Sequence, residues 1–165
     1  MPKMANNIVP TKTEHSNELN KGILASIPIF IGYIPVAITF GLLAKATGLT
    51  LLESFLFSAL VFAGASQFMA LQLMVLGVAY PQIIAITFIM NFRHFLMSSY
   101  LSTLFPTHEH HWLPFISFGI TDESFAYFST HKQNQKKQFI LGLQYSAYIS
   151  WVGGTAVGYI FGAII

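Results

Sequence analysis

The sequence contains no cysteine and few charged residues. The lack of cysteine excludes a disulfide framework, a thiolate zinc site and an iron–sulfur cluster. Charged residues make up 8% of the 165 positions, whereas a soluble domain carries about 25%. Beside 54% hydrophobic residues, this small charged fraction excludes both a soluble domain and a disordered chain. A formal net charge of +2 from scattered basic residues also excludes a nucleic-acid binder, which leaves an integral membrane protein.

Long uncharged runs separate the few charges. The longest lies between Glu53 and Arg93, and Gly77 and Pro81 divide it because glycine and proline interrupt helices. About 20 helical residues cross the bilayer core, so we predict an all-α integral membrane bundle of five transmembrane helices. The predicted spans are residues 22–44, 54–76, 82–104, 112–130 and 139–161. The first two are candidates for discontinuous helices.

Lysine placement predicts the orientation of the chain. Residues 1–21 are expected to form a polar cytoplasmic tail, mobile as far as Asn20, and residues 22–165 the transmembrane domain. A cleaved signal peptide is disfavoured because Pro28, Tyr33 and Pro35 interrupt a first span that is too long for one. Six lysines fall on the side of the N-terminus and only Lys45 on the other. The positive-inside rule then places the N-terminus in the cytoplasm and the C-terminus outside.

Polar residues interrupt the apolar pattern near the middle of four spans. They are Pro28, Gly32 and Pro35 in the first, Gly64-Ala65-Ser66-Gln67 in the second, Asn91, Arg93 and His94 in the third, and Thr121-Asp122-Glu123 in the fourth. Their matching depths suggest a single site at the bilayer midplane. Unwound backbone at that depth survives only where it lines protein or a cavity. Close helix packing by small residues is the alternative for Gly64 to Gln67.

Arg93, Asp122 and Glu123 are charged groups at a depth where charge is unfavourable. Two ionised acids at a helix centre cost about 5–7 kcal/mol on the insertion scale, which exceeds what the apolar residues of the fourth span regain. We therefore expect Arg93 to pair with one acid while the other is protonated or faces water. Asp122 is favoured as the more buried acid because it shares a helical stripe with small residues. His94 and the two acids are candidates for proton coupling, and a purely structural ion pair is the alternative.

The remaining motifs indicate packing and loops. Gly154, Gly158 and Gly162 are spaced four apart, which allows close helix packing against this chain or another. Thr50 and Glu53 form a predicted capping box. His108-Glu109-His110-His111 is read as a solvated loop, so no metal or cofactor is expected. No metalloprotease motif occurs and Ser66 has no evident base, which argues against an enzyme.

The same segments resemble the AzlC family, the large subunit of branched-chain amino acid exporters. The matching residues are Gly32-Tyr33-Ile34-Pro35, the segment 61–68, Asn91-Phe92-Arg93-His94 and the segment 121–126. The resemblance covers about residues 22–165 and implies export of branched-chain amino acids with a small hydrophobic AzlD-like partner subunit. Family members usually continue with further membrane segments, so the chain is expected to be truncated or completed by another chain.

These observations together predict a permease subunit of the inner (plasma) membrane. The candidate substrate-binding residues are Gly64, Ser66, Gln67, Asn91 and Arg93. Arg93 or the Gly64–Gln67 break would hold the substrate carboxylate, and Asp122 or Glu123 its ammonium group. The alternative is a non-transporting assembly subunit, or a half-transporter that needs a partner chain.

Overall fold

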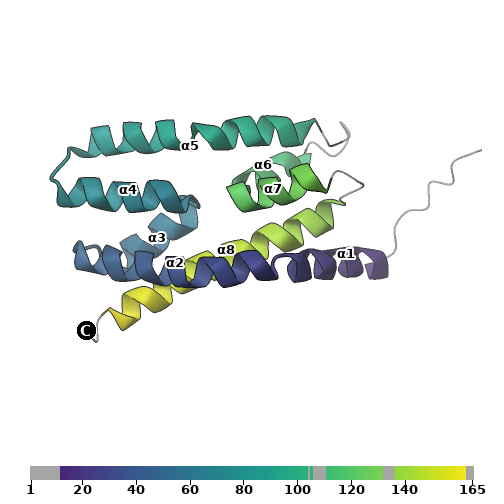
Figure 1. The fold of residues 1–165 in the computed structure, drawn as a ribbon, viewed down its shortest axis with the longest axis horizontal. Helices are drawn as coiled ribbons and strands as arrows, with labels where there is room; N and C mark the ends of the chain where they lie inside the picture. Colours follow the sequence, from purple (N-terminus) through teal and green to yellow (C-terminus); the bar gives the residue numbers. More distant parts are fainter. Residues whose placement is uncertain (1–11, 104, 106–110, 132–135, 163–165) are drawn as a thin grey trace, which may run out of the picture.

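The computed structural model describes residues 12–103, 105, 111–131 and 136–162, and their regular structure is entirely helical (Figure 1). The α-helices are α1 Lys12–Ala25, α2 Ile27–Ala46, α3 Leu51–Leu60, α4 Gly64–Val75, α5 Tyr80–Ser102, α6 Leu113–Phe118, α7 Asp122–Thr130 and α8 Lys137–Phe161. The all-α prediction is confirmed. Among the described helices, only α2 is long and apolar enough to cross a membrane by length and composition.

The first predicted span contains the end of α1 and most of α2, and helical structure begins earlier than expected. Helix α1 starts at Lys12 and joins α2 through a single turn at Ser26, whose N–H donates to the Gly22 carbonyl at 3.0 Å. Pro28 lies in the first turn of α2, where its missing N–H is tolerated, and α2 runs on through Pro35. The prediction of a mobile tail is therefore wrong from Lys12 onward. The predicted break in this span is limited to the turn at Ser26, and Pro35 does not interrupt α2.

Helix α8 packs closely along α2 through glycines. A Cβ added at Gly158 would overlap the backbone of Ile38, and one at Gly154 would lie 2.7 Å from the Cβ of Ala37. Gly162 lies against Leu42 in the same way. The structure thus places the glycine ladder against α2 of the same chain, where small residues let two backbones approach.

The Gly158→Ala substitution tests this close approach. Overpacking of a tight contact costs about 1–3 kcal/mol, so we expect Gly158→Ala to lower the free energy of unfolding by that amount. Gly153→Ala is the matched control on the same helix, because its added Cβ would meet no atom within 4 Å. Reversible unfolding of the purified protein in detergent measures both. Equal stability of the two variants would contradict the packing assigned to Gly158.

The second predicted span does not cross in one direction but turns back on itself. Helices α3 and α4 are separated by Val61-Phe62-Ala63 and form hairpin 1, residues 51–75. The start of α3 and the end of α4 lie together, since Leu49 and Met74 pack on one cluster with Ala44. The tip lies elsewhere, with Phe62 in a separate cluster beside Ala37, Ala147 and Trp151.

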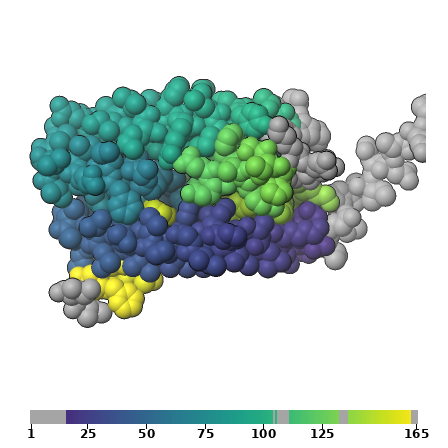
Figure 2. Space-filling model, viewed as in Figure 1, coloured from purple at the N-terminus to yellow at the C-terminus, as the bar shows by residue number. Residues whose placement is uncertain are grey.

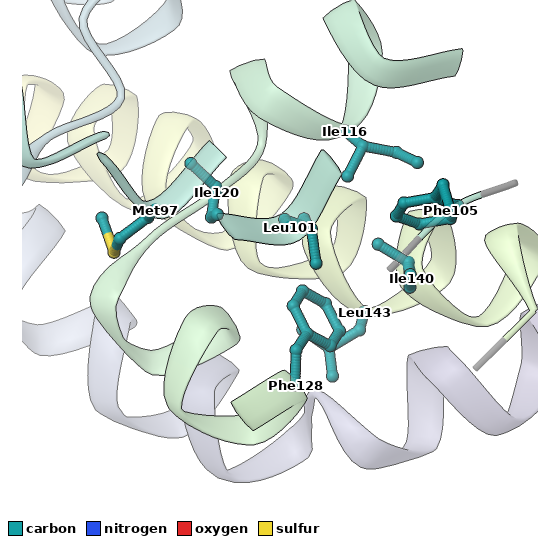
Figure 3. Close-up of a cluster of buried hydrophobic side chains, with 8 residues drawn as sticks. All are labelled: Met97, Leu101, Phe105, Ile116, Ile120, Phe128, Ile140 and Leu143. Carbon is teal, nitrogen blue, oxygen red and sulfur yellow. The ribbon is translucent and has the colours of Figure 1, made fainter. Parts of the chain in front are cut away.

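The fourth predicted span is a second hairpin that enters from the opposite end. Helices α6 and α7 are separated by Gly119-Ile120-Thr121 and form hairpin 2, residues 113–130. Its open end lies near the start of α8, where Tyr127 stacks on Phe139. Figure 3 shows the apolar cluster that fixes hairpin 2 against α5 and α8. The cluster contains Met97, Leu101, Phe105, Ile116, Ile120, Phe128, Ile140 and Leu143.

Two buried glutamines stabilise the hairpins in equivalent ways. The Gln67 amide donates to the Phe57 carbonyl at 2.9 Å near the end of α3. The Gln144 amide donates to the Ile116 carbonyl at 3.0 Å near the end of α6. The Ile116 carbonyl lies in the last turn of α6, where a helix leaves carbonyls without an intrahelical partner. The Phe57 carbonyl also accepts from the Val61 N–H at 3.0 Å, so Gln67 adds a second hydrogen bond there.

The order of elements forms an inverted repeat. Helix α2 followed by hairpin 1, and α5 followed by hairpin 2, have the same layout with opposite direction (Figure 1). The second helix of each hairpin also begins alike, because the hydroxyls of Ser66 and Ser124 donate to the carbonyls of Ala63 and Thr121 at 2.9 and 3.1 Å. Inverted repeats built on broken helices are characteristic of secondary transporters, whose sites lie between the repeats.

Candidate functional site

The tips of the two hairpins meet beside α2, α5 and α8 and line a cavity of about 640 Å³. Figure 2 shows the hairpins lying end to end between α5 and α2, with part of α8 visible in the gap. The lining residues are Pro28, Ile29, Gly32, Tyr33 and Val36 of α2, Phe62, Ala63, Gly64, Ala65 and Phe68 of hairpin 1, Arg93 and His94 of α5, Thr121, Asp122 and Glu123 of hairpin 2, and Trp151 of α8. The inverted repeat therefore encloses one polar centre in apolar walls.

The N-terminus of α4 opens into this cavity without a side-chain cap. Its N-cap residue is Ala63, and the first i→i−4 bond is donated by Gln67 to the Ala63 carbonyl at 3.1 Å. Helical geometry leaves the N–H groups of Gly64 and Ala65 without a partner inside the helix. Gly64 also lies so close to Trp151 that an added Cβ would be 2.6 Å from the indole. This helix end suits an anion.

The N-terminus of α7 lines the same cavity but is already capped and negatively charged. Thr121 and Ser124 form a reciprocal capping box, with the Ser124 N–H donating to the Thr121 hydroxyl at 3.3 Å. Asp122 and Glu123 occupy the first turn, where the helix dipole favours carboxylates. The cavity therefore has an anion-binding end at α4 and an acidic end at α7.

Arg93 pairs with Asp122, one of the two acids that the sequence offered. The Arg93 Nη1 and Asp122 Oδ2 atoms are 2.6 Å apart, and the two side chains are 42% and 52% exposed. Asp122 is not the buried acid that the sequence suggested, because α7 begins at Asp122 and the backbone break interrupts the stripe that was expected to continue from Gly119. The side of α7 turned to the protein carries Ser124 and Phe128 instead.

Glu123 accepts a hydrogen bond from the Tyr33 hydroxyl of α2. The ion pairs among the described residues are Lys21–Glu18 and Arg93–Asp122, so Glu123 has no cationic partner within that part of the chain. The Tyr33 ring packs edge-on against Trp151, with 5.4 Å between ring centroids, and against Phe62 at 6.2 Å. Tyr33 therefore links the acidic end of the cavity to the tip of hairpin 1.

His94 lies between this cavity and a second one of about 560 Å³. The second cavity is mainly apolar and is lined by residues of hairpin 1, α5 and α6, including Phe88 and Asn91. Asn91 donates to the Ser66 hydroxyl at 3.0 Å, while its own Oδ1 is buried and has no hydrogen-bond partner among the residues that the structure describes. The two cavities share Phe62 and Ala63, so the tip of hairpin 1 separates them.

Only two of the five predicted substrate-binding residues line the first cavity. Gly64 and Arg93 line it, Asn91 lines the second cavity, and Ser66 and Gln67 line neither. Gln67 is fully buried and also accepts from the Trp151 indole N–H at 2.9 Å. Both polar groups of the Gln67 side chain are therefore engaged in hydrogen bonds within the protein, one to hairpin 1 and one to α8.

Sequence reasoning missed the role of Tyr33, although its position between Pro28 and Pro35 in an apolar span was a signal. Trp151 of α8 also lines the cavity. Residues 108–110 of the histidine-rich loop lie outside the described residues. Within the ranges that the structure describes, no group of three or more histidine, cysteine or acidic residues is placed to hold a metal.

Comparison with known proteins identifies relatives. The family model of the AzlC protein matches residues 28–165. The chain is 40% identical over 146 residues to an uncharacterized membrane protein of Archaeoglobus fulgidus, covering 88% of this chain and 63% of the relative. It is 34% identical to the inner membrane protein YgaZ of Escherichia coli, covering 90% and 63%. It is 30% identical to the branched-chain amino acid transport protein AzlC of Bacillus subtilis, covering 85% and 56%.

The chain therefore spans about 63% of the length of the first two relatives. No solved structure matches it.

Proposed function

This chain belongs to the AzlC family, and from that membership we propose that it is a permease subunit that exports branched-chain or similar small apolar amino acids. The family is one of transporters, not of enzymes. Its Bacillus subtilis relative is named as a branched-chain amino acid transport protein. The observation that carries the proposal is the cavity between the two hairpin tips, which offers opposite charges in apolar walls.

The electrostatics of the cavity suit a zwitterion. The uncapped N-terminus of α4 at Gly64 would hold the substrate carboxylate, because Arg93 is already engaged by Asp122. Glu123, which has no cationic partner among the described residues, would hold the ammonium group. The aromatic rings of Tyr33 and Trp151 add favourable faces for a cation. Glu123 and His94 both line the cavity, and in this proposal they would carry a coupled proton.

The proposed membrane arrangement differs from five simple spans. Helices α2, α5 and α8 would cross the bilayer, and the hairpins would enter from opposite sides and meet at the midplane. Backbone that breaks at this depth is tolerated because it lines a cavity. Connections α5–α6 and α7–α8 then lie on the side of the N-terminus, and the turn near Pro81 moves to the side of Lys45. The lysine distribution stays six to one, which supports a cytoplasmic N-terminus and an external C-terminus.

The proposed partner is a small hydrophobic AzlD-like subunit. Its support is the family resemblance. The alternative function is a non-transporting assembly subunit, or a half-transporter that is inactive without a partner chain.

Amino acid efflux from cells loaded with labelled leucine or valine tests the proposal. Cells that express the chain with a co-expressed small AzlD-like subunit are expected to export label faster than cells with an empty vector. Cells with the chain alone and with the subunit alone are the controls. Stable complex formation without any efflux would favour the assembly role, and neither complex nor efflux would reject both.

A further inference from the structure

Gly32 is a helical glycine that lines the cavity and has no structural need to be glycine. It lies inside α2, and a Cβ added there would meet no atom within 4 Å. The backbone does not require it, because the positive-φ glycines of the described chain are Gly48 and Gly77. Glycine in a helix interior costs about 1 kcal/mol relative to alanine, so its presence needs another explanation.

Except for Gly153, the other glycines within helices lie at close contacts. Gly22, Gly41 and Gly158 each lie where an added Cβ would collide with the backbone of the facing helix. Gly64 lies against Trp151. Gly153 is open like Gly32, but it lines neither cavity. Gly32 therefore combines free space at its Cβ position with a place in the cavity wall.

The free space at the Cβ position of Gly32 lies in the same cavity as the charged residues of hairpin 2. Ile29, Tyr33 and Val36 on the same helix also line the cavity. Tyr33 follows Gly32 directly and its hydroxyl binds Glu123. A bound amino acid held at Glu123 would thus have its apolar side chain within reach of Gly32 and of the apolar residues that flank it.

We propose that Gly32 determines the size of the apolar side chain that the site accepts, by leaving unfilled the volume that a larger residue would occupy. The inference rests on the proposed function, because it deepens the substrate class of the same cavity. A Cβ introduced at this position would meet no neighbouring atom within 4 Å, and Gly32 itself lines the cavity. It would exclude large substrates before small ones.

Binding of alanine, valine, leucine and isoleucine to the purified full chain in lipid nanodiscs tests the inference. Gly32→Ala and Gly32→Val form a graded series, and isothermal titration gives each dissociation constant. Gly32→Val is expected to weaken leucine and isoleucine binding at least tenfold (about the discrimination that one or two methylenes give) while alanine binding changes less than threefold. Gly32→Ala is expected to show the same order with smaller changes.

Gly153→Val is the matched control, since it adds the same side chain to an open helical position away from both cavities. It is expected to leave all four dissociation constants unchanged. If Gly32→Val folds and weakens the binding of all four amino acids equally, or leaves the ratios of their dissociation constants unchanged, the role of Gly32 is overturned while the proposed function stands. If Gly32→Val does not fold, Gly32→Ala decides by the same ratios. Lack of binding of all four by the folded wild-type chain would overturn the proposed function and the inference with it.

Discussion

Arg93→Ala is expected to reduce the rate of leucine export strongly. The substitution removes the 2.6 Å ion pair with Asp122 and leaves two carboxylates without a cation at the N-terminus of α7. Free carboxylates in the cavity would compete for the substrate ammonium group and repel its carboxylate. Hydrogen bonds to charged groups contribute about 1.5–3 kcal/mol, so we expect a loss of about 10- to 100-fold in export rate.

A neutral pair separates this functional role from simple attachment of α7 to α5. The double variant Arg93→Gln with Asp122→Asn keeps two hydrogen-bonding side chains and removes both charges. If the ion pair only holds helices together, the double variant should export leucine like the wild type. We expect instead that the double variant is present in the membrane in the wild-type amount but does not export leucine, measured by quantitative blotting and labelled leucine efflux in the same cells. Full activity of the double variant would contradict a role for these charges in transport.

The apolar runs in the sequence predicted where helices occur, but they did not predict which runs form a single helix and which form a hairpin. The third and fifth predicted spans, residues 82–104 and 139–161, correspond to α5 Tyr80–Ser102 and α8 Lys137–Phe161. The runs at 54–76 and 112–130 are long enough for single spans, but length alone cannot separate one crossing from two half-length helices that turn back. The turn depends on the partners of the broken backbone, and Gln67 and Gln144 come from α4 and α8. Such long-range hydrogen bonds leave no periodic signal in the sequence.

The candidate site was predictable where charge or backbone breaks were visible in the sequence. Arg93 and Asp122 stand out in apolar spans, and their pairing follows from the unfavourable energy of unpaired charge in a membrane. The sequence could not predict that Ser66 lies outside the cavity. Its position depends on the turn of hairpin 1, which places Gly64 and not Ser66 in the cavity lining. The sequence showed a glycine at position 32 but not that it lines a cavity, because free space around its Cβ position is a property of the folded chain.

Glu123→Gln is expected to abolish net leucine export while preserving the fold. Glutamine is nearly isosteric with glutamate and can still accept a hydrogen bond from the Tyr33 hydroxyl, so the contact between α2 and hairpin 2 is retained. The loss of the negative charge removes both candidate roles of Glu123, which are binding of the substrate ammonium group and transfer of a proton. Tyr33→Phe is the matched control, because it removes the hydroxyl partner and keeps the carboxylate in the cavity.

Two transport modes distinguish the roles of Glu123 in proteoliposomes that contain the chain and its partner subunit. Exchange of labelled for unlabelled leucine needs substrate binding but no net proton movement, whereas export driven by a pH gradient needs both. If Glu123 binds the ammonium group, Glu123→Gln should abolish both modes. If Glu123 carries only the proton, exchange should continue while gradient-driven export is lost. Because Glu123 has no cationic partner among the described residues, we expect the first result, with Tyr33→Phe retaining exchange. Wild-type rates of both modes in Glu123→Gln would exclude Glu123 from the site.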